Sequence, residues 1–133
     1  MEPRKYGLFL KTQLEYPAAV EAIKAALKAE GFGVLTEIDV ADTMKQKLGR
    51  EFRRYDIIGA CNPPLAHRAL EADIDIGLLL PCNVIVYEDE AGGSVIAALD
   101  PETMMGLTQN DLLAPVASEA RSRLERALRS IEG

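Results

Sequence analysis

Hydrophobic and polar residues alternate in several short segments of the chain, and this alternation predicts half-buried β-strands. In the first segment, Tyr6, Leu8 and Leu10 lie between more polar neighbours. The last two segments are joined around Gly92-Gly93, which favours a hairpin. The five predicted strands cover residues 5–12, 34–40, 53–61, 82–88 and 94–99.

Segments with a helical period follow the first three strands. The first predicted helix has Pro17 in its first turn and ends at Gly31. The second starts at an N-cap, Asp42 or Thr43, and ends at Gly49. The third runs from about residue 63 to 72, because Asn62 is a good N-cap and prolines follow it.

The C-terminal segment predicts a long final helix. Its apolar stripe consists of Val116, Ala120, Leu124, Leu128 and Ile131. Residues 100–106, which end in Met104-Met105-Gly106, are predicted as a loop before it.

This order, β-α-β-α-β-α-β-β-α, predicts an α+β fold in a single domain spanning residues 1–133. It lacks the strict strand–helix alternation of a doubly wound parallel sheet. We expect a mostly antiparallel five-stranded sheet with the two long helices packed on one face.

Charge and composition restrict the partners. The 21 acidic and 15 basic residues give a net charge of −6, and the basic residues are scattered, which argues against binding to nucleic acid or an anionic membrane surface. No signal-peptide core or membrane-spanning stretch is present, so we expect a cytoplasmic protein. Asn and Gln number six together and the C-terminal segment is dense in Glu and Arg, which favours a thermostable protein.

Two similar segments carry the most unusual chemistry: Cys61-Asn62-Pro63-Pro64 and Leu80-Pro81-Cys82-Asn83. A thiol directly before a helix N-terminus has a lowered pKa, which predicts a reactive Cys61 if Asn62 is the N-cap. The alternative is that both cysteines are small buried hydrophobes, that Asn62 is only a cap and that the prolines only end strands.

Other candidate groups are weaker. The cysteine spacing and the single histidine, His67, do not predict a zinc site, and His67 is expected at the surface. Glu37 and Asp39 share a strand face, either as paired carboxylates with Lys45 or Lys47 as the counter-charge or as part of a solvated face. No glycine-rich phosphate loop is present, and we predict no cofactor and no metal.

Two blocks, Gly59-Ala60-Cys61-Asn62-Pro63 and Leu79-Leu80-Pro81-Cys82-Asn83-Val84, resemble the bacterial "domain of unknown function 302" family. The resemblance spans approximately residues 16–101. It implies an α+β fold of the TATA-binding-protein-like class and a homodimer, but no activity, and the fold name does not imply DNA binding.

The resemblance also directs attention to a set of candidate site residues. These are Asp39, Tyr55, Cys61, Asn62, Cys82 and Asn83, together with Pro81 between the two blocks. Three functions remain open. They are a non-enzymatic module that binds or senses a small molecule between sheet and helices, thiol-based redox or metal handling at Cys61 and Cys82, and a structural or adaptor domain.

Overall fold

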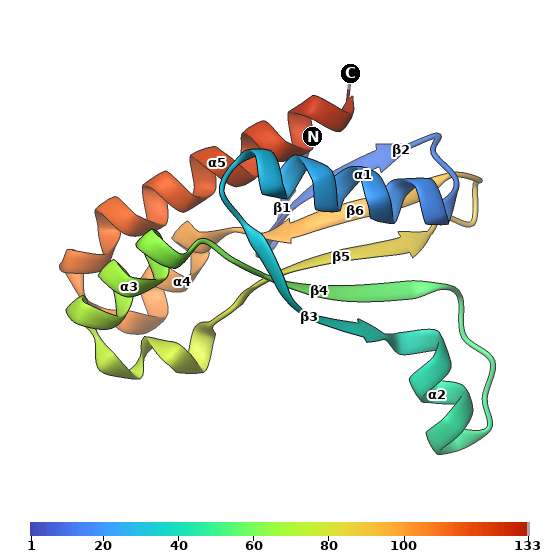
Figure 1. The fold of residues 1–133 in the computed structure, drawn as a ribbon, viewed down its shortest axis with the longest axis horizontal. Coiled ribbons are helices and arrows are strands. Elements are labelled where there is room, and N and C mark those ends of the chain that lie inside the picture. Colours follow the sequence, from blue (N-terminus) through green and yellow to red (C-terminus); the bar gives the residue numbers. More distant parts are fainter. Residues whose placement is uncertain (133) are drawn as a thin grey trace.

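Six antiparallel strands form one sheet in the computed structural model, which describes residues 1–132 (Figure 1). The strands are β1 (Glu2–Arg4), β2 (Gly7–Thr12), β3 (Gly33–Asp39), β4 (Tyr55–Cys61), β5 (Cys82–Glu88) and β6 (Ser94–Leu99). Their order across the sheet is β1-β2-β6-β5-β4-β3. The predicted α+β class and antiparallel sheet are confirmed. The predicted number of strands was one too low, because residues 2–4 pair with β2 as a short edge strand.

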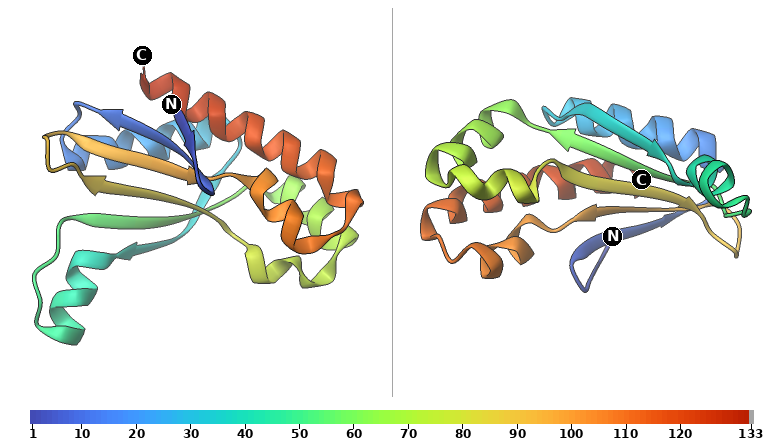
Figure 2. Two further views of the ribbon diagram at one scale, coloured as in Figure 1. Left: turned by 180° about the vertical axis from the view of Figure 1, so that it is seen from behind. Right: turned by 90° about the horizontal axis from the view of Figure 1, so that it is seen from below.

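Within the described residues, five α-helices and two 3₁₀ segments connect and cover the strands. They are α1 (Tyr16–Ala29), α2 (Val40–Leu48), α3 (Pro63–Ala72), η1 (Ile74–Leu79), α4 (Pro101–Thr108), η2 (Asp111–Leu113) and α5 (Ala114–Glu132). The two long helices, α1 and α5, pack on one face of the sheet, as predicted. Figure 2 shows the sheet from behind, where no helix of the described residues lies across it.

The main core lies between this helix pair and the sheet. Strand residues facing the helices are apolar and almost fully buried: Leu8, Leu10, Ile58, Ala60, Val84, Val86, Ile96 and Ala98. They meet one face of α1, which buries Val20, Ile23 and Leu27 at helical spacing. Leu124 and Leu128 of α5 complete the core. Burying each of the Val, Leu and Ile side chains in this set stabilises the fold by about 1.5–3 kcal/mol.

A smaller cluster lies beyond the ends of β4 and β5, where α3, η1 and α4 pack against the first half of α5 (Figure 1). Its buried residues are Ala69, Ile76 and Leu113. The N-terminus of α3 follows the sequence prediction, because the Asn62 side chain accepts a hydrogen bond from the Leu65 N–H at 3.2 Å.

The predicted loop over residues 100–106 is wrong, because Pro101–Thr108 forms α4. Asp100 caps this helix by accepting a hydrogen bond from the Glu102 N–H. The N-cap of α2 was also predicted too late: Asp39, rather than Asp42 or Thr43, occupies that position and accepts from the Asp42 N–H. In both cases an Asp at a strand end starts the helix.

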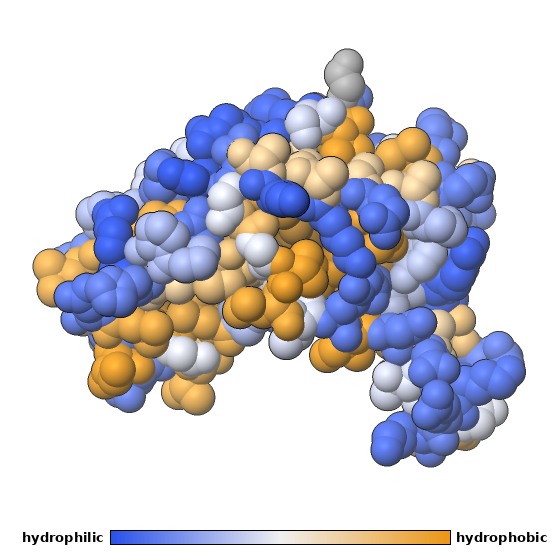
Figure 3. Space-filling view, viewed as in Figure 1, coloured by the Kyte–Doolittle hydropathy of each residue, from blue (hydrophilic) through white to orange (hydrophobic). Residues whose placement is uncertain are grey.

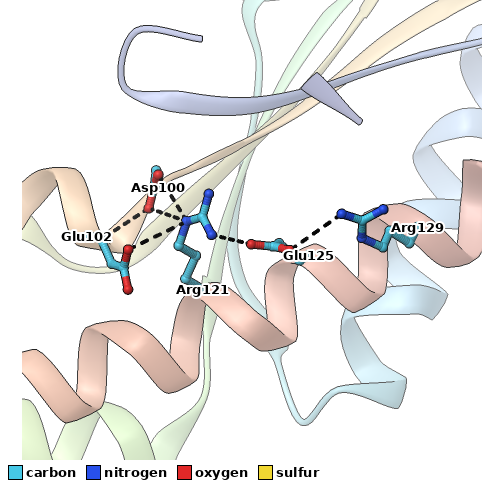
Figure 4. A network of polar contacts seen from close by, with 5 residues as sticks. All are labelled: Asp100, Glu102, Arg121, Glu125 and Arg129. Carbon is cyan, nitrogen blue, oxygen red and sulfur yellow. Dashed lines mark hydrogen bonds and ion pairs between the residues drawn. The ribbon is translucent and has the colours of Figure 1, made fainter. Parts of the chain in front are cut away.

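Ion pairs fix α4 to α5 (Figure 4). The Arg121 guanidinium lies 3.2 Å from Asp100, 3.9 Å from Glu102, and also pairs with Glu125. Glu125 in turn lies 3.8 Å from Arg129. A further i,i+4 pair on α5 joins Glu119 to Arg123 at 3.3 Å. This network links the start of α4 to α5.

The sheet face opposite α1 and α5 is apolar along its middle. The strand register aligns Phe9, Ala97, Ile85, Ile57 and Ile38 in one row across five strands. In the neighbouring row, the rings of Tyr55 and Tyr87 stack at 5.4 Å. We refer to this surface as the open face.

The helix α2 projects beyond the sheet edge in Figure 1 and buries none of its own residues. Its Leu48 and the following Phe52 are exposed by 63% and 48%. Within residues 1–132, the helices are too short or too polar to cross a lipid bilayer.

Candidate functional site

A pocket of about 380 Å³ opens at the end of the sheet, inside the ring formed by α3, η1, α4 and α5. Strand ends β4 and β5 form its floor through Ala60, Cys61 and Cys82. Leu35 of the edge strand β3 adds one wall. The helical walls are formed mostly by aliphatic and thioether side chains: Leu65, Ala66, Ala69, Leu70, Ile76, Leu80, Met104, Met105, Leu113, Val116, Ala117 and Ala120.

The pocket lining is almost entirely apolar. Among the described residues that line it, none carries an ionisable acid or amine, and the polar side chains are those of Asn62 and Thr108 besides the two thiols. Asn62 uses its carbonyl oxygen to cap α3 and donates its amide to the Glu30 carbonyl at 3.5 Å. Thr108 donates to the Met105 carbonyl at 3.2 Å. Both groups therefore hold the walls in place.

Figure 3 shows hydrophobic side chains gathered at the end of the molecule formed by α3 and the neighbouring segments. Exposed leucines continue this surface. Leu78 of η1 and Leu107 of α4 are exposed by 89% and 74%, and both line a second, smaller hollow beside the first. Asn83 also lines this second hollow.

The two cysteines both line the first pocket, and neither forms a disulfide. Cys82 pairs in register with Ala60, the residue before Cys61. Because successive residues of a strand project from opposite faces, the two thiols are not a directly opposed cross-strand pair. Burial, and to a smaller extent the neighbouring Cys61, raises the pKa of Cys82 to about 11, so its thiol is protonated at neutral pH.

Three of the six candidate residues therefore meet in one pocket: Cys61, Asn62 and Cys82. Asn83 lies at the neighbouring hollow. Asp39 and Tyr55 line neither pocket. They lie near each other, at the end of β3 and the start of β4 that point away from the first pocket. There Asp39 caps α2 and Tyr55 stacks on Tyr87.

The sequence pattern does not reveal the pocket residues Met104 and Met105, because it predicts a loop where the structure has α4. The Asp100-Pro101 pair is an N-cap followed by a first-turn proline and could have revealed the helix. His67 lies at the surface with 74% of its side chain exposed, as predicted, and pairs with Glu71 at 2.9 Å.

A second group of ionisable side chains lies away from the pocket, where β3 and β4 meet α1. Asp56 is only 4% exposed, and Glu37 lies near it on β3. One interpretation of the sequence offers Lys45 or Lys47 as the counter-charge of Glu37, and this is wrong. The Glu37 carboxylate instead lies 2.7 Å from the Lys24 ammonium on α1. Lys45 pairs instead with Glu51. In the part of the chain that the structure describes, no group of three or more His, Cys, Asp or Glu side chains could hold a metal ion.

Comparison with known proteins places this architecture in a family. The sequence profile of "Domain of unknown function DUF302" matches residues 9–131, so the chain belongs to the DUF302 family. The crystal structure of an uncharacterized conserved DUF302 protein from Bacillus stearothermophilus is similar, with a TM-score of 0.88 and 27% sequence identity over 96% of this chain and 99% of that one. A search of curated proteins gave no match.

Proposed function

We propose that this DUF302 protein binds a small, uncharged, apolar molecule in the pocket at the end of the sheet. The observation that carries the proposal is the pocket itself, which measures about 380 Å³ and has no charged side chain among its described lining residues. That volume falls within the usual range of small-molecule sites, about 300–1,000 Å³. A carboxylate or ammonium group inside it would lose its hydration without gaining a partner.

The binding proposal is tested with N-phenyl-1-naphthylamine, a neutral apolar dye that fluoresces when it leaves water. We expect saturable binding to the intact chain. Ala66→Phe fills the pocket from α3, where Ala66 is half-buried, and should weaken binding by about tenfold or more, which corresponds to about 1.4 kcal/mol.

The matched control is Ala25→Phe, which makes the same change on the exposed side of α1, outside the pocket. It should bind the dye as the wild type does. Equal loss of binding in both variants, or no saturable binding by the wild type, would contradict the proposal. A thermal melt of each variant establishes that it is folded.

Thiol chemistry at Cys61 and Cys82 remains the second candidate, because both thiols line the same pocket. Disulfide exchange and metal binding both need a thiolate. The raised pKa of Cys82 disfavours that form, so we propose that the thiols serve mainly as weakly polar parts of the pocket wall.

We further propose that the protein acts as a homodimer through the open face. At about 4.8 Å between strands and about 3.3 Å per residue, the five longer strands offer roughly 500 Å² in projection. A specific interface needs roughly 800 Å² per partner. Contacts to α2, which projects beyond the sheet and whose own residues are all unburied, would supply the difference.

Light scattering after size-exclusion chromatography tests the dimer. Ile85→Lys places a charge in the middle of the open face and should give a monomer. Leu112→Lys changes a leucine that is 71% exposed on η2, away from that face, and should leave the mass unchanged. A monomeric wild type at micromolar concentration would rule out this interface.

A further inference from the structure

Asp56 is a buried acidic residue on the helix-facing side of β4. It pairs in register with Val86, a core residue of β5, and with Asp39 of the edge strand β3. Glu37 lies two residues before Asp39 on the same face of β3, so it is a diagonal neighbour of Asp56. Three carboxyl groups therefore lie on one face of two adjacent strands.

One oxygen atom of this cluster is buried without a hydrogen-bond partner among the described residues. Asp56 is 4% exposed, and among the described residues its Oδ2 atom has no hydrogen-bond donor. A buried carboxylate without a donor is costly. A proton on the Asp56 carboxyl removes the problem, because the group then donates a hydrogen bond to Glu37, which accepts it as a carboxylate.

The residues around the cluster favour a protonated Asp56 beside an ionised Glu37. The Lys24 ammonium on α1 lies 2.7 Å from Glu37 and stabilises the carboxylate there. Hydrogen bonds from Asp56 and Lys24 lower the pKa of Glu37. Burial, followed by the hydrogen bond to Glu37 and its negative charge, raises the pKa of Asp56 to about 7. Below about pH 7 the shared proton therefore resides on Asp56 rather than on Glu37.

Three other ionisable groups lie around Asp56 on α1, β3 and the segment before β4: Tyr16, Asp39 and Arg54. Burial and the nearby carboxylates raise the pKa of Tyr16 on α1 to about 12, so it stays neutral. Arg54, which precedes β4, stacks over the Tyr16 ring at 5.0 Å and pairs with Glu88. Asp39 of β3 is occupied as the cap of α2.

We propose that Asp56, Glu37 and Lys24 form a proton-dependent clasp that holds the edge strand β3 against β4 and α1, and that loss of the shared proton loosens β3. When the proton leaves, Asp56 and Glu37 are both anionic and repel each other, and the Asp56 carboxylate is left charged in a buried position. The strand that gives way is β3, because all seven of its residues are exposed and it has a neighbour on one side only.

The position of β3 affects both α2 and the apolar pocket. The helix α2 starts directly at the end of β3. Leu35, which lies at the register shift in the middle of β3, lines the pocket. Loosening β3 therefore opens one wall of the pocket, so the clasp makes the access of an apolar ligand depend on pH. This second consequence rests on the proposed function, whereas the clasp itself does not.

Hydrogen exchange of the intact wild-type chain at pH 6 and pH 8.5 tests the clasp, with each rate corrected for the intrinsic effect of pH. We expect the protection factors of β3 amides to fall at least about tenfold at the higher pH, while those of β6 stay constant. Asp56→Asn keeps a donor toward Glu37 without a titrating proton, and its β3 should stay protected at both pH values.

The control Asp42→Asn changes an exposed acid on α2 outside the clasp and should keep the wild-type response. Unchanged β3 protection in the wild type, or an Asp56→Asn variant that responds as the wild type does, would overturn the proposal.

Binding of N-phenyl-1-naphthylamine to the same proteins separates the two ideas. Faster dye entry at pH 8.5 than at pH 6 in the wild type, but not in Asp56→Asn, supports the link to the pocket. Equal entry rates beside a changed β3 protection would refute that link. No dye binding at either pH beside a changed β3 protection would refute the proposed function and leave the clasp supported.

Discussion

The guanidinium Nε of Arg121 on α5 lies 3.2 Å from the carboxylate of Asp100, which caps α4. One carboxylate thus does two things: it accepts the hydrogen bond that starts α4, and it anchors that helix to α5. Since Met104 and Met105 of α4 line the apolar pocket, this pair helps to hold one pocket wall in place.

Replacing Asp100 should therefore destabilise the fold by losing both contacts. We expect Asp100→Ala to cost about 1–2 kcal/mol in the free energy of unfolding, mainly through loss of the cap. Asp100→Asn keeps a cap oxygen and loses only the charge, so it should cost less. Urea unfolding of the three proteins measures the difference, and an Ala variant as stable as the wild type would contradict the assignment.

Gly59 lies where β3, β4 and Pro81 approach one another closely. A Cβ atom at this position would lie 2.8 Å from Pro81 Cγ and would also overlap the Thr36 hydroxyl. We expect Gly59→Ala to destabilise the protein by about 1–3 kcal/mol through overpacking. Adding Thr36→Ala should recover part of the loss, since it removes one of the two overlaps.

Gly77→Ala is the matched control for this prediction, because nothing lies within 4 Å of the added methyl group. It should change the midpoint of urea unfolding very little. If both glycine variants lose the same stability, crowding at Gly59 is not the cause.

The thiol of Cys82 should react slowly with alkylating reagents. With a pKa of about 11, roughly one thiol in a thousand is ionised at pH 8, and thiolate is the reactive form. In a Cys61→Ser variant, iodoacetamide should label Cys82 far more slowly than a free cysteine, and the rate should still rise with pH above 9. Mass spectrometry follows the labelling. A rate at pH 8 that equals that of an unfolded control would show an ordinary thiol.

Asp56 should make stability depend on pH. Its pKa is raised from 3.8 to about 7, so the folded state holds the proton more tightly than the unfolded state. This contribution is fully present below about pH 4 and is lost as pH rises to about 7. Thermal melts should therefore show Asp56→Asn gaining stability relative to the wild type between pH 4 and pH 8, with no further change above that range. A constant difference in melting temperature would contradict the shift.

Local signals predicted much of the fold. Asn62 was identified as a cap from its own type and the prolines after it, and Gly49 as the end of α2, where it adopts a φ of 66°. The strand pattern gave β5 and β6 their observed ranges. These features depend on residues within a few positions of one another, which is why a sequence reveals them.

The features that the sequence did not reveal depend on distant partners. The apolar residues of α4 show no clear helical stripe, and Arg121, which anchors its cap, comes 21 positions later. Asp56 shares one face of β4 with the apolar residues Ile58 and Ala60. An acidic residue on a buried strand face is unusual, and the sequence indicates its importance in this way only. Its meaning depends on Glu37 and Lys24, which only the folded sheet brings close.

The two hydrophobic clusters also differ in how firmly they are closed. Sixteen buried residues form the large one between the sheet and the helix pair, whereas three hold the cluster around the pocket. Local opening costs least where few apolar contacts are broken. We therefore expect the end containing α3, η1 and α4 to open locally while the rest stays folded. The apolar ligand proposed for the pocket could then enter and leave without global unfolding of the protein.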